Sequence, residues 1–331
     1  MKDAGNNTYL LDPVTIAMVG MRGVGKTSLL ASMYSQLQSL GAGFAPSLDD
    51  DEGRTDEIMQ RYIVDLTRFA TGRELRPVET GIVGTMDKST YRFAATTTRN
   101  GRFREKRFTI PVDFVDFPGG WFKEEKHAEV DDVLQSSWVS FVAIDAPAMM
   151  SEPFLHKKFN DPEGIKRVYE RNAPSMFSHT VVLTLIRAEK YIQEGKREEL
   201  YAAVQEQYGD WARTLERHGI CVFATYVETV GGVVFASFEE LPDKSHKANY
   251  IRTRAGYQPR NCQIPLQLAL FRGIDSLADR IAEKIENDGA WDKIWKFFFG
   301  DIDALAKEAC HNVRDAIVQR KPISGADYIE I

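Results

Sequence analysis

One stretch, Val14 to Leu30, constrains the fold of this 331-residue chain more than any other. It starts with a mostly apolar run, Val14 to Val19, which is typical of a buried parallel strand. The next segment, GMRGVGKT from Gly20 to Thr27, fits the pattern G-x-x-x-x-G-K-[ST] at every fixed position. Apolar residues then recur at helical spacing up to Gly41, which ends the predicted helix. A strand, a glycine-rich loop and a helix thus follow one another in the order of a phosphate-binding loop.

The spacing of this motif has a chemical reason. Gly20 and Gly25 allow the backbone to curl so that successive N–H groups point at a diphosphate. The helix that starts at Lys26 adds the positive end of its dipole, and the Lys26 ammonium reaches the β- and γ-phosphates. The Thr27 hydroxyl is the expected Mg²⁺ ligand. The loop residues expected to bind the nucleotide are Gly20, Arg22, Gly23, Val24, Gly25, Lys26, Thr27 and Ser28.

A second phosphate-binding element is expected at the end of a later strand. The segment from Tyr91 to Arg99 alternates like a strand, a turn follows at Asn100, and a second strand leads into DFPGG. We expect Asp116, at the carboxyl end of that strand, to hold Mg²⁺ through water and the Gly119 N–H to bond the γ-phosphate. Taken alone, D-x-x-G is a weak motif, and its other meaning is an ordinary turn after a strand.

The composition narrows the class of protein. A net charge of −6 and scattered basic residues argue against a nucleic-acid partner bound by bulk electrostatics. The three cysteines are far apart, which fits a reducing compartment. No apolar segment approaches a membrane span or a signal peptide, so the sequence predicts a cytoplasmic protein.

Strands and helices alternate along the chain, which predicts an α/β fold with the ligand at the carboxyl ends of the strands. The expected sheet is mostly parallel, with one antiparallel edge hairpin strand and helices on both faces. Within it we expect an inserted helix at about residues 56–70, a long connection from Met149 to Ser178 and an irregular stretch from Glu239 to Cys262. This unit, residues 1–288, precedes a C-terminal helical extension, residues 289–331. The aromatic cluster of the extension either packs on the core or docks a partner.

With GMRGVGKT and DFPGG in place, the chain resembles the translation-factor-related (TRAFAC) class of P-loop GTPases over about Val14 to Glu286. Within that class it looks like the bacterial double-GTPase families of conflict systems. The resemblance implies GTP and GDP as ligands and Mg²⁺ as cofactor. In this class a threonine just before the second strand binds Mg²⁺ when the γ-phosphate is present, which implies Thr80 here, with Thr85 as the alternative.

The base-recognition motif departs from the class pattern [NT]-K-x-D, because the matching residues run from Ile186 to Glu189. Arg187 could stack over the base as a lysine would, and Glu189 could accept both N–H groups of the guanine edge. The alternative is a surface Arg-Glu pair at a strand exit. The later base loop is matched only loosely, by Thr225 and the two residues after it.

The catalytic side is also incomplete. Many relatives place a glutamine directly after D-x-x-G to orient water, and here that residue is Gly120, so unaided hydrolysis should be slow. The expected catalytic groups are Lys26, Thr80 and Arg22, the last as an arginine finger within the chain. Glu124 and His127 are further candidates for positioning water.

Three functions follow from these residues. The first is a Mg²⁺-dependent GTPase that acts as a molecular switch and reports its nucleotide state to a protein effector or activator. The second is an ATPase of the same fold, which the degenerate base motif allows. The third is an interaction module that binds nucleotide without turnover, which Gly120 favours.

Overall fold

The computed structural model describes residues 2–3, 8–10, 13–39, 44–46, 54–72, 88–100, 105–122, 126–176, 179–244, 246–253, 256–269 and 328–330. Thr80, Thr85 and Glu124 lie outside these residues. Most of the expected extension, 289–331, lies outside them too, so its helical character and its boundary at 288 stay predictions.

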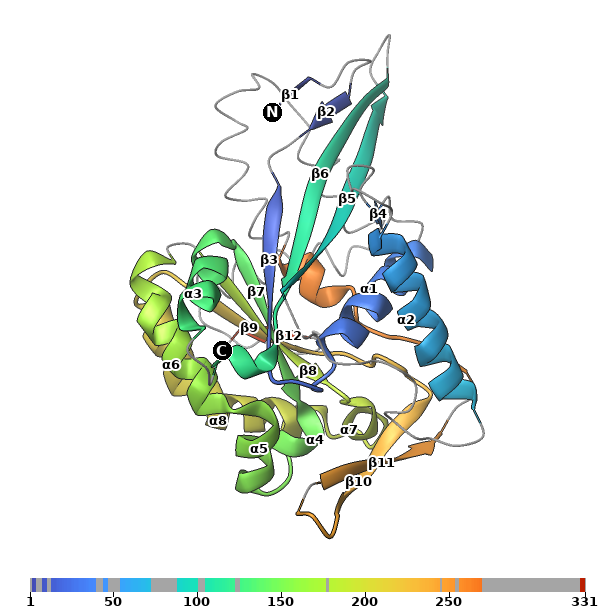
Figure 1. Ribbon diagram of the computed structural model, residues 1–331, viewed down its shortest axis with the longest axis vertical. Helices are drawn as coiled ribbons and strands as arrows, with labels where there is room; N and C mark the ends of the chain where they lie inside the picture. Colours follow the sequence, from blue (N-terminus) through green and yellow to red (C-terminus); the bar gives the residue numbers. More distant parts are fainter. Residues whose placement is uncertain are drawn as a thin grey trace.

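In the described part of the chain a ten-stranded sheet forms the centre of the molecule (Figure 1). Its order is β1-β2-β6-β3-β7-β8-β9-β12, with β5 paired to β6 and β4 paired to β5. Neighbours from β6 through β9 are parallel, whereas β5 and β6 form a long antiparallel hairpin. This confirms the mostly parallel α/β sheet with an antiparallel hairpin. The strands are β1 (Lys2–Asp3), β2 (Thr8–Leu10), β3 (Val14–Val19), β4 (Phe44–Pro46), β5 (Ser89–Asn100), β6 (Glu105–Asp116), β7 (Val139–Asp145), β8 (Thr180–Ile186), β9 (Cys221–Tyr226) and β12 (Tyr328–Glu330).

Two central strands, β7 and β8, are buried along their whole length because both of their faces are covered. Every residue of β7 and of β8 is buried, as expected for parallel strands between two helical layers. Their parallel register sets Asp145 beside Ile186, and that of β3 and β6 sets Met18 beside Asp116. The carboxyl ends of the strands therefore collect the candidate site residues at one edge of the sheet.

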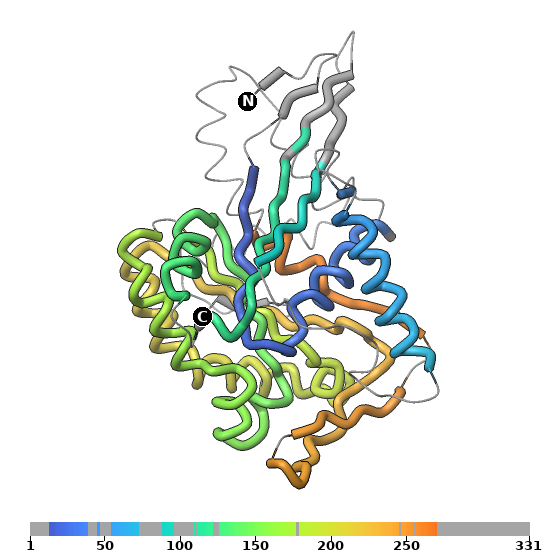
Figure 2. The backbone as a smooth tube through the Cα atoms, viewed as in Figure 1, coloured from blue at the N-terminus to red at the C-terminus, as the bar shows by residue number. Residues whose placement is uncertain are grey.

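Helices cover both faces of the sheet and build two separate cores. One core lies between α1, α2 and sheet residues such as Phe93 and Phe114, and the other between the opposite face and α3, α6 and α8. The backbone trace shows the same division, with α1 and α2 in blue across the sheet from α6 and α8 (Figures 1 and 2). The helices are α1 (Lys26–Ser39), α2 (Arg54–Thr71), η1 (Gly119–Phe122), α3 (His127–Ser136), α4 (Ala146–Met149), α5 (Pro153–Asn160), α6 (Pro162–Asn172), η2 (Ala173–Ser175), α7 (Glu189–Gln193) and α8 (Arg197–Glu216).

Three parts of the fold differ from the expectation. The connection from Met149 to Ser178 carries α5 and α6, each with a proline in its first turn. The stretch from Glu239 to Cys262 is not wholly irregular, because β11 (His246–Arg252) pairs antiparallel with β10 (Val233–Glu240). The strand β11 is half exposed and of mixed polarity, so it lacks the apolar pattern of a core strand. The third difference is β12, which joins the main sheet beside β9.

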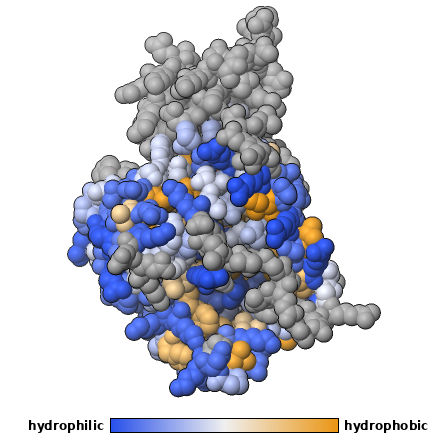
Figure 3. Space-filling view, viewed as in Figure 1, coloured by the Kyte–Doolittle hydropathy of each residue, from blue (hydrophilic) through white to orange (hydrophobic). Residues whose placement is uncertain are grey.

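Few large apolar side chains are exposed, and the described surface on the face drawn in Figure 3 is mostly hydrophilic. Among the described residues, those exposed are Val64, Phe154 and Ile251, at 45%, 49% and 53%. No helix in this part of the chain is long and apolar enough to cross a membrane. The apolar residues thus mainly serve the two cores.

Candidate functional site

The glycine-rich loop connects β3 to α1 and has a backbone that side chains would not tolerate. Gly20, Gly23 and Gly25 have φ angles of 141°, 79° and 113°, in the range that glycine adopts readily. A Cβ on Gly20 would lie 2.9 Å from the carbonyl oxygen of Ala143 in β7. The Val24 N–H donates to the Met21 carbonyl at 3.3 Å and closes the turn. The loop is therefore a tight turn that depends on its glycines, and its phosphate-binding role stays a prediction.

Lys26, the first residue of α1, is folded back onto this loop. Its ammonium donates to the Gly20 carbonyl at 2.9 Å and lies 3.6 Å from Asp116 Oδ1. Burial lowers the pKa of Lys26, and the negative charge of Asp116 opposes that shift. A buried cation held only by neutral and carboxylate oxygens is well placed to exchange these contacts for phosphate oxygens.

Thr27 and Asp116 come from α1 and β6 and meet beside this lysine. The Thr27 hydroxyl donates to Asp116 Oδ2 at 3.4 Å, and both side chains are buried. No group of three or more His, Cys, Asp or Glu side chains suited to a metal occurs among the described residues. Mg²⁺ at a nucleotide site is usually held by one or two protein oxygens, water and phosphate. A hydroxyl and a carboxylate at this spacing fit that donor set.

The D-x-x-G segment packs directly on the glycine-rich loop. A Cβ on Gly119 would lie 2.3 Å from the Arg22 backbone nitrogen, so only glycine fits there. Gly120 follows in η1, and Trp121 is buried and stacks on Phe117 with ring centroids 6.2 Å apart. The two motifs therefore meet through their backbones, and the aromatic pair packs beside the turn.

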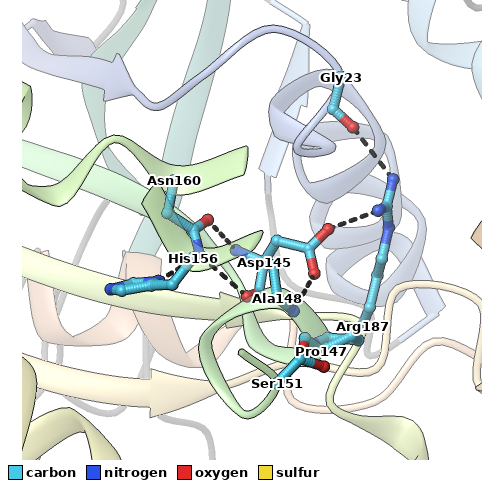
Figure 4. A network of polar contacts seen from close by, with 8 residues as sticks. All are labelled: Gly23, Asp145, Pro147, Ala148, Ser151, His156, Asn160 and Arg187. Carbon is cyan, nitrogen blue, oxygen red and sulfur yellow. Dashed lines mark hydrogen bonds and ion pairs between the residues drawn. The ribbon is translucent and has the colours of Figure 1, made fainter. Parts of the chain in front are cut away.

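The predicted base-binding arginine sits at the end of β8 and ties three elements together. Arg187 has a left-handed backbone (φ 63°), and its guanidinium donates to Asp145 Oδ2 at 2.5 Å and to the Gly23 carbonyl at 3.0 Å (Figure 4). Asp145 is buried and also accepts the Ala148 N–H at 3.0 Å. Asn160 donates to the Asp145 carbonyl and accepts its N–H. This network joins the region of the predicted base-binding residues Arg187 and Glu189, called the base end below, to the glycine-rich loop.

Asp145 is a site residue that the sequence reasoning missed. Its signal was present, since it ends an apolar strand next to the strand that ends before Arg187. Polar residues that end neighbouring parallel strands meet at one edge of the sheet.

Glu189 lies beside Arg187, but its carboxylate faces a backbone turn. Glu189 Oε1 accepts the Val230 N–H at 3.3 Å, and the Gly231 N–H also contacts the carboxylate. Burial raises the pKa of Glu189 to about 7, nearby Glu228 adds to the rise, and the backbone donors oppose it. Glu189 is therefore a buried side chain and not a member of the exposed surface pair that the sequence left open.

These residues enclose a cavity of about 90 Å³ at the base end. Thr225 does not line it, since it is fully buried in β9 with its hydroxyl on the Tyr226 carbonyl at 3.4 Å. The threonine that does line the cavity is Thr229. The lining residues are Gly25, Ser28, Leu66, Phe69, Ile186, Arg187, Glu189, Thr229, Val230, Val233, Phe235 and Tyr250.

The catalytic candidates are less closely grouped. Arg22 is exposed, and its backbone nitrogen faces Gly119. His127 is exposed at the start of α3. Their catalytic roles, and those of Thr80 and Thr85, stay predictions.

The chain is an α/β protein in which a glycine-rich loop joins the central strand β3 to α1, and Asp116 from β6 faces Thr27 at the start of α1. Searches of family models and of curated proteins found no match. Among solved structures, the chain is similar to the S. cerevisiae Ski7 GTPase-like domain, which was crystallised bound to GTP. The identity is 15%, the TM-score is 0.33, and the match covers 66% of this chain and 43% of that one. A similarity this low does not identify the site, so the candidate site is assigned from the residues of this chain alone.

Proposed function

We propose that this protein binds GTP and GDP together with Mg²⁺, hydrolyses GTP slowly and acts as a nucleotide-dependent switch for a protein partner. The observation that carries the proposal is the meeting of Lys26, Thr27 and Asp116 beneath a loop of positive-φ glycines. Each of these groups has a contact that a metal-bound triphosphate could replace. The double-GTPase resemblance makes a bacterial conflict or signalling system the proposed setting.

The phosphates would be held by the N–H groups from Arg22 to Thr27 and by the Lys26 ammonium. Thr27, Asp116 and, in the triphosphate state, Thr80 are the proposed Mg²⁺ ligands. When bound, the ion would neutralise charge that develops on the phosphates. The chain's own residues position the triphosphate, whereas Gly120 has no side chain to orient water.

Glu189 is the residue proposed to select guanine over adenine. The carboxylate lies at the wall of the cavity, where it could turn from the Val230 N–H to the N–H groups of a guanine edge. Adenine lacks that pair of donors. If this assignment holds, Glu189→Ala should weaken GDP binding much more than ADP binding.

The test is a calorimetric titration with GDP, GTP, ADP and ATP, each with and without Mg²⁺, on the wild type and on Lys26→Ala. We expect Lys26→Ala to weaken triphosphate binding by a few kcal/mol, because a charged hydrogen bond is lost. The matched control is Lys157→Ala, on the exposed side of α5. Equal affinity in all three proteins would overturn the P-loop assignment, and a wild type that prefers ATP would replace the GTPase with an ATPase.

Turnover is measured separately. We expect single-turnover GTP hydrolysis of the order of 10⁻⁴ to 10⁻² s⁻¹, as for GTPases without an arginine from a partner. A rate above about 1 s⁻¹ would show that the chain already carries its full catalytic set. Binding with no turnover at all would instead favour the interaction module, which Gly120 also supports.

A further inference from the structure

One face of α2 runs along the whole candidate site. Tyr62, Leu66 and Phe69 are spaced by four and three residues, so they lie on the same side of the helix. Leu66 and Phe69 line the cavity at the base end. Thr27 and Asp116, at the phosphate end, both influence the pKa of Tyr62, so its hydroxyl lies close to them. An element outside every recognised motif therefore borders both ends of the site.

The β10–β11 hairpin also lines the cavity. Phe235 and Tyr250 line the cavity from this side. The rings of Phe69 and Tyr250 meet edge to face, with centroids 5.4 Å apart and an interplanar angle of 89°. The Tyr250 hydroxyl is also within the electrostatic reach of Arg187, Asp145 and Glu189. Two aromatic rings thus line the same cavity as the polar residues of the base motif.

A single arginine joins these two walls. Arg252, at the end of β11, donates to the Ala70 carbonyl at 2.7 Å and to the Gly72 carbonyl. These are carbonyls at the carboxyl end of α2, where a cation is favoured by the helix dipole. The hairpin is therefore fastened to α2 directly beside the paired rings.

We infer that Phe69 and Tyr250 form an aromatic clamp for the planar base of a bound nucleotide, and that Arg252 is the latch that holds the clamp closed. The inference rests on the proposed nucleotide binding and extends the site to residues that no motif assigns. Aromatic rings bind any base through its π-face, so the clamp supplies affinity, and the choice between bases rests with Glu189.

The cavity volume indicates that the two rings of the clamp move apart when a base binds. A volume of about 90 Å³ is small beside the roughly 300–1,000 Å³ of ordinary ligand pockets. In the clamp that we infer, a purine enters as Phe69 and Tyr250 separate, which strains the contacts of Arg252 with α2. Entry and exit of the base therefore both depend on the latch.

The clamp is tested by stopped-flow binding of GDP that carries a fluorophore on its ribose. We expect Phe69→Leu and Tyr250→Leu to raise the dissociation constant by roughly 5- to 100-fold. Tyr250→Phe keeps the ring and should retain wild-type affinity. The controls are Val64→Ala on α2 and Ile251→Ala on β11, whose side chains are exposed. The ratio of GDP to ADP affinity should stay unchanged in the clamp variants.

The outcomes separate this inference from the function on which it rests. If the wild type binds no nucleotide, or Lys26→Ala binds as tightly as wild type, the proposed function fails. If Lys26→Ala loses binding while Phe69→Leu and Tyr250→Leu bind like the controls, the clamp alone is wrong. Should Phe69→Leu not fold by circular dichroism, the Tyr250→Leu and Tyr250→Phe pair decides.

The latch is tested by rates. Arg252→Ala should raise both the association and the dissociation rate constants of the fluorescent GDP by roughly tenfold, because two hydrogen bonds to the moving helix are lost. The dissociation constant should change much less than either rate. Lys247→Ala, an exposed change on the same strand, is the control. Rates equal to those of the control would overturn the latch.

Discussion

The phosphate end and the base end of the candidate site are built in different ways. The phosphate end comes from one contiguous stretch, Gly20 to Thr27, with Asp116 and Gly119 added from the next parallel strand. The base end draws on α2, the end of β8, the turn at Thr229 and the β10–β11 hairpin. One end follows a local motif, and the other depends on segments that are far apart in sequence.

This difference follows from the ligand chemistry. A diphosphate is recognised by backbone N–H groups and one cation, so the residue types and their spacing are nearly dictated. A flat base can be recognised by any combination of stacking surface and edge contacts, which many arrangements of side chains can supply. The phosphate end should therefore be intolerant of small changes, and the base end should respond in a graded way.

Gly20→Ala should break the phosphate end most severely. Its φ of 141° is nearly closed to other residues, and the new Cβ would lie 2.9 Å from the Ala143 carbonyl oxygen. We expect a loss of about 3 kcal/mol in unfolding free energy and no measurable triphosphate binding. Chemical denaturation and calorimetry measure the two effects.

Gly23→Ala is the matched control for this change. Gly23 also has a positive φ, but a Cβ there would meet nothing within 4 Å. Only the backbone strain of about 1 kcal/mol should appear. Equal losses at Gly20 and Gly23 would show that contact with β7 does not set the shape of the loop.

Arg187→Ala tests whether the base end is tied to the phosphate end. It leaves Asp145 buried without its ion pair and removes the bond to the Gly23 carbonyl. Breaking a buried pair in this way should cost about 3 kcal/mol in unfolding free energy and weaken nucleotide binding. Arg213→Ala removes an exposed pair with Asp210 and should cost less than 1 kcal/mol. Similar losses of unfolding free energy in the two variants would show that Arg187 does not link the base end to the phosphate end.

Glu189→Gln probes the base end through pH. Burial raises the Glu189 pKa to about 7 from an ordinary value of 4.5. Below pH 4.5 the Glu189 carboxyl is mostly neutral in both the folded and the unfolded protein, so its ionisation does not change the free energy of unfolding. As the pH rises toward 7 the unfolded chain loses this proton first, and the folded wild type loses stability, by up to roughly 3 kcal/mol. Glutamine has no such cost, so the stability advantage of Glu189→Gln should grow from pH 4.5 to 7 and then level off.

Thermal unfolding across pH 4.5 to 8 measures this advantage. Glu199→Gln, at an exposed position of α8, is the control. A difference between Glu189→Gln and wild type that does not vary with pH would contradict the buried ionisation.

The contrast between the two ends also explains which parts of the fold and of the candidate site could be predicted from the sequence. The glycine-rich loop, Lys26, Thr27 and Asp116 were predictable because their chemistry dictates both residue type and spacing. The parallel core was predictable because β7 and β8 are mostly apolar.

Only some residues of the base end were predicted from the sequence. Arg187 and Glu189 were assigned because they stand where the resembled class carries its [NT]-K-x-D motif, but Asp145 was missed because its partner comes from a neighbouring strand. Tyr250 lies in a strand without an apolar pattern, inside a stretch expected to be irregular. Its place in the cavity depends on tertiary packing against α2, which no local spacing encodes.

The smallest expected effect lies where the two ends meet, at Tyr62 on α2. Its hydroxyl lies close to Thr27, since Thr27 influences the pKa of Tyr62, and the proposed Mg²⁺ would also engage the Thr27 hydroxyl. Tyr62→Phe removes a hydroxyl that competes with Mg²⁺ for Thr27, so GTP binding with Mg²⁺ should tighten by roughly 2- to 10-fold, as expected from the net worth of one hydrogen bond. Binding measured with a chelator in place of Mg²⁺ should stay unchanged. Tyr257→Phe likewise removes a hydroxyl, 3.1 Å from Ser32 Oγ on the other side of α1, and serves as the control. If the two variants gain equally, or if the gain persists without Mg²⁺, then α2 does not couple the base end to the metal-binding pair and the two ends act independently.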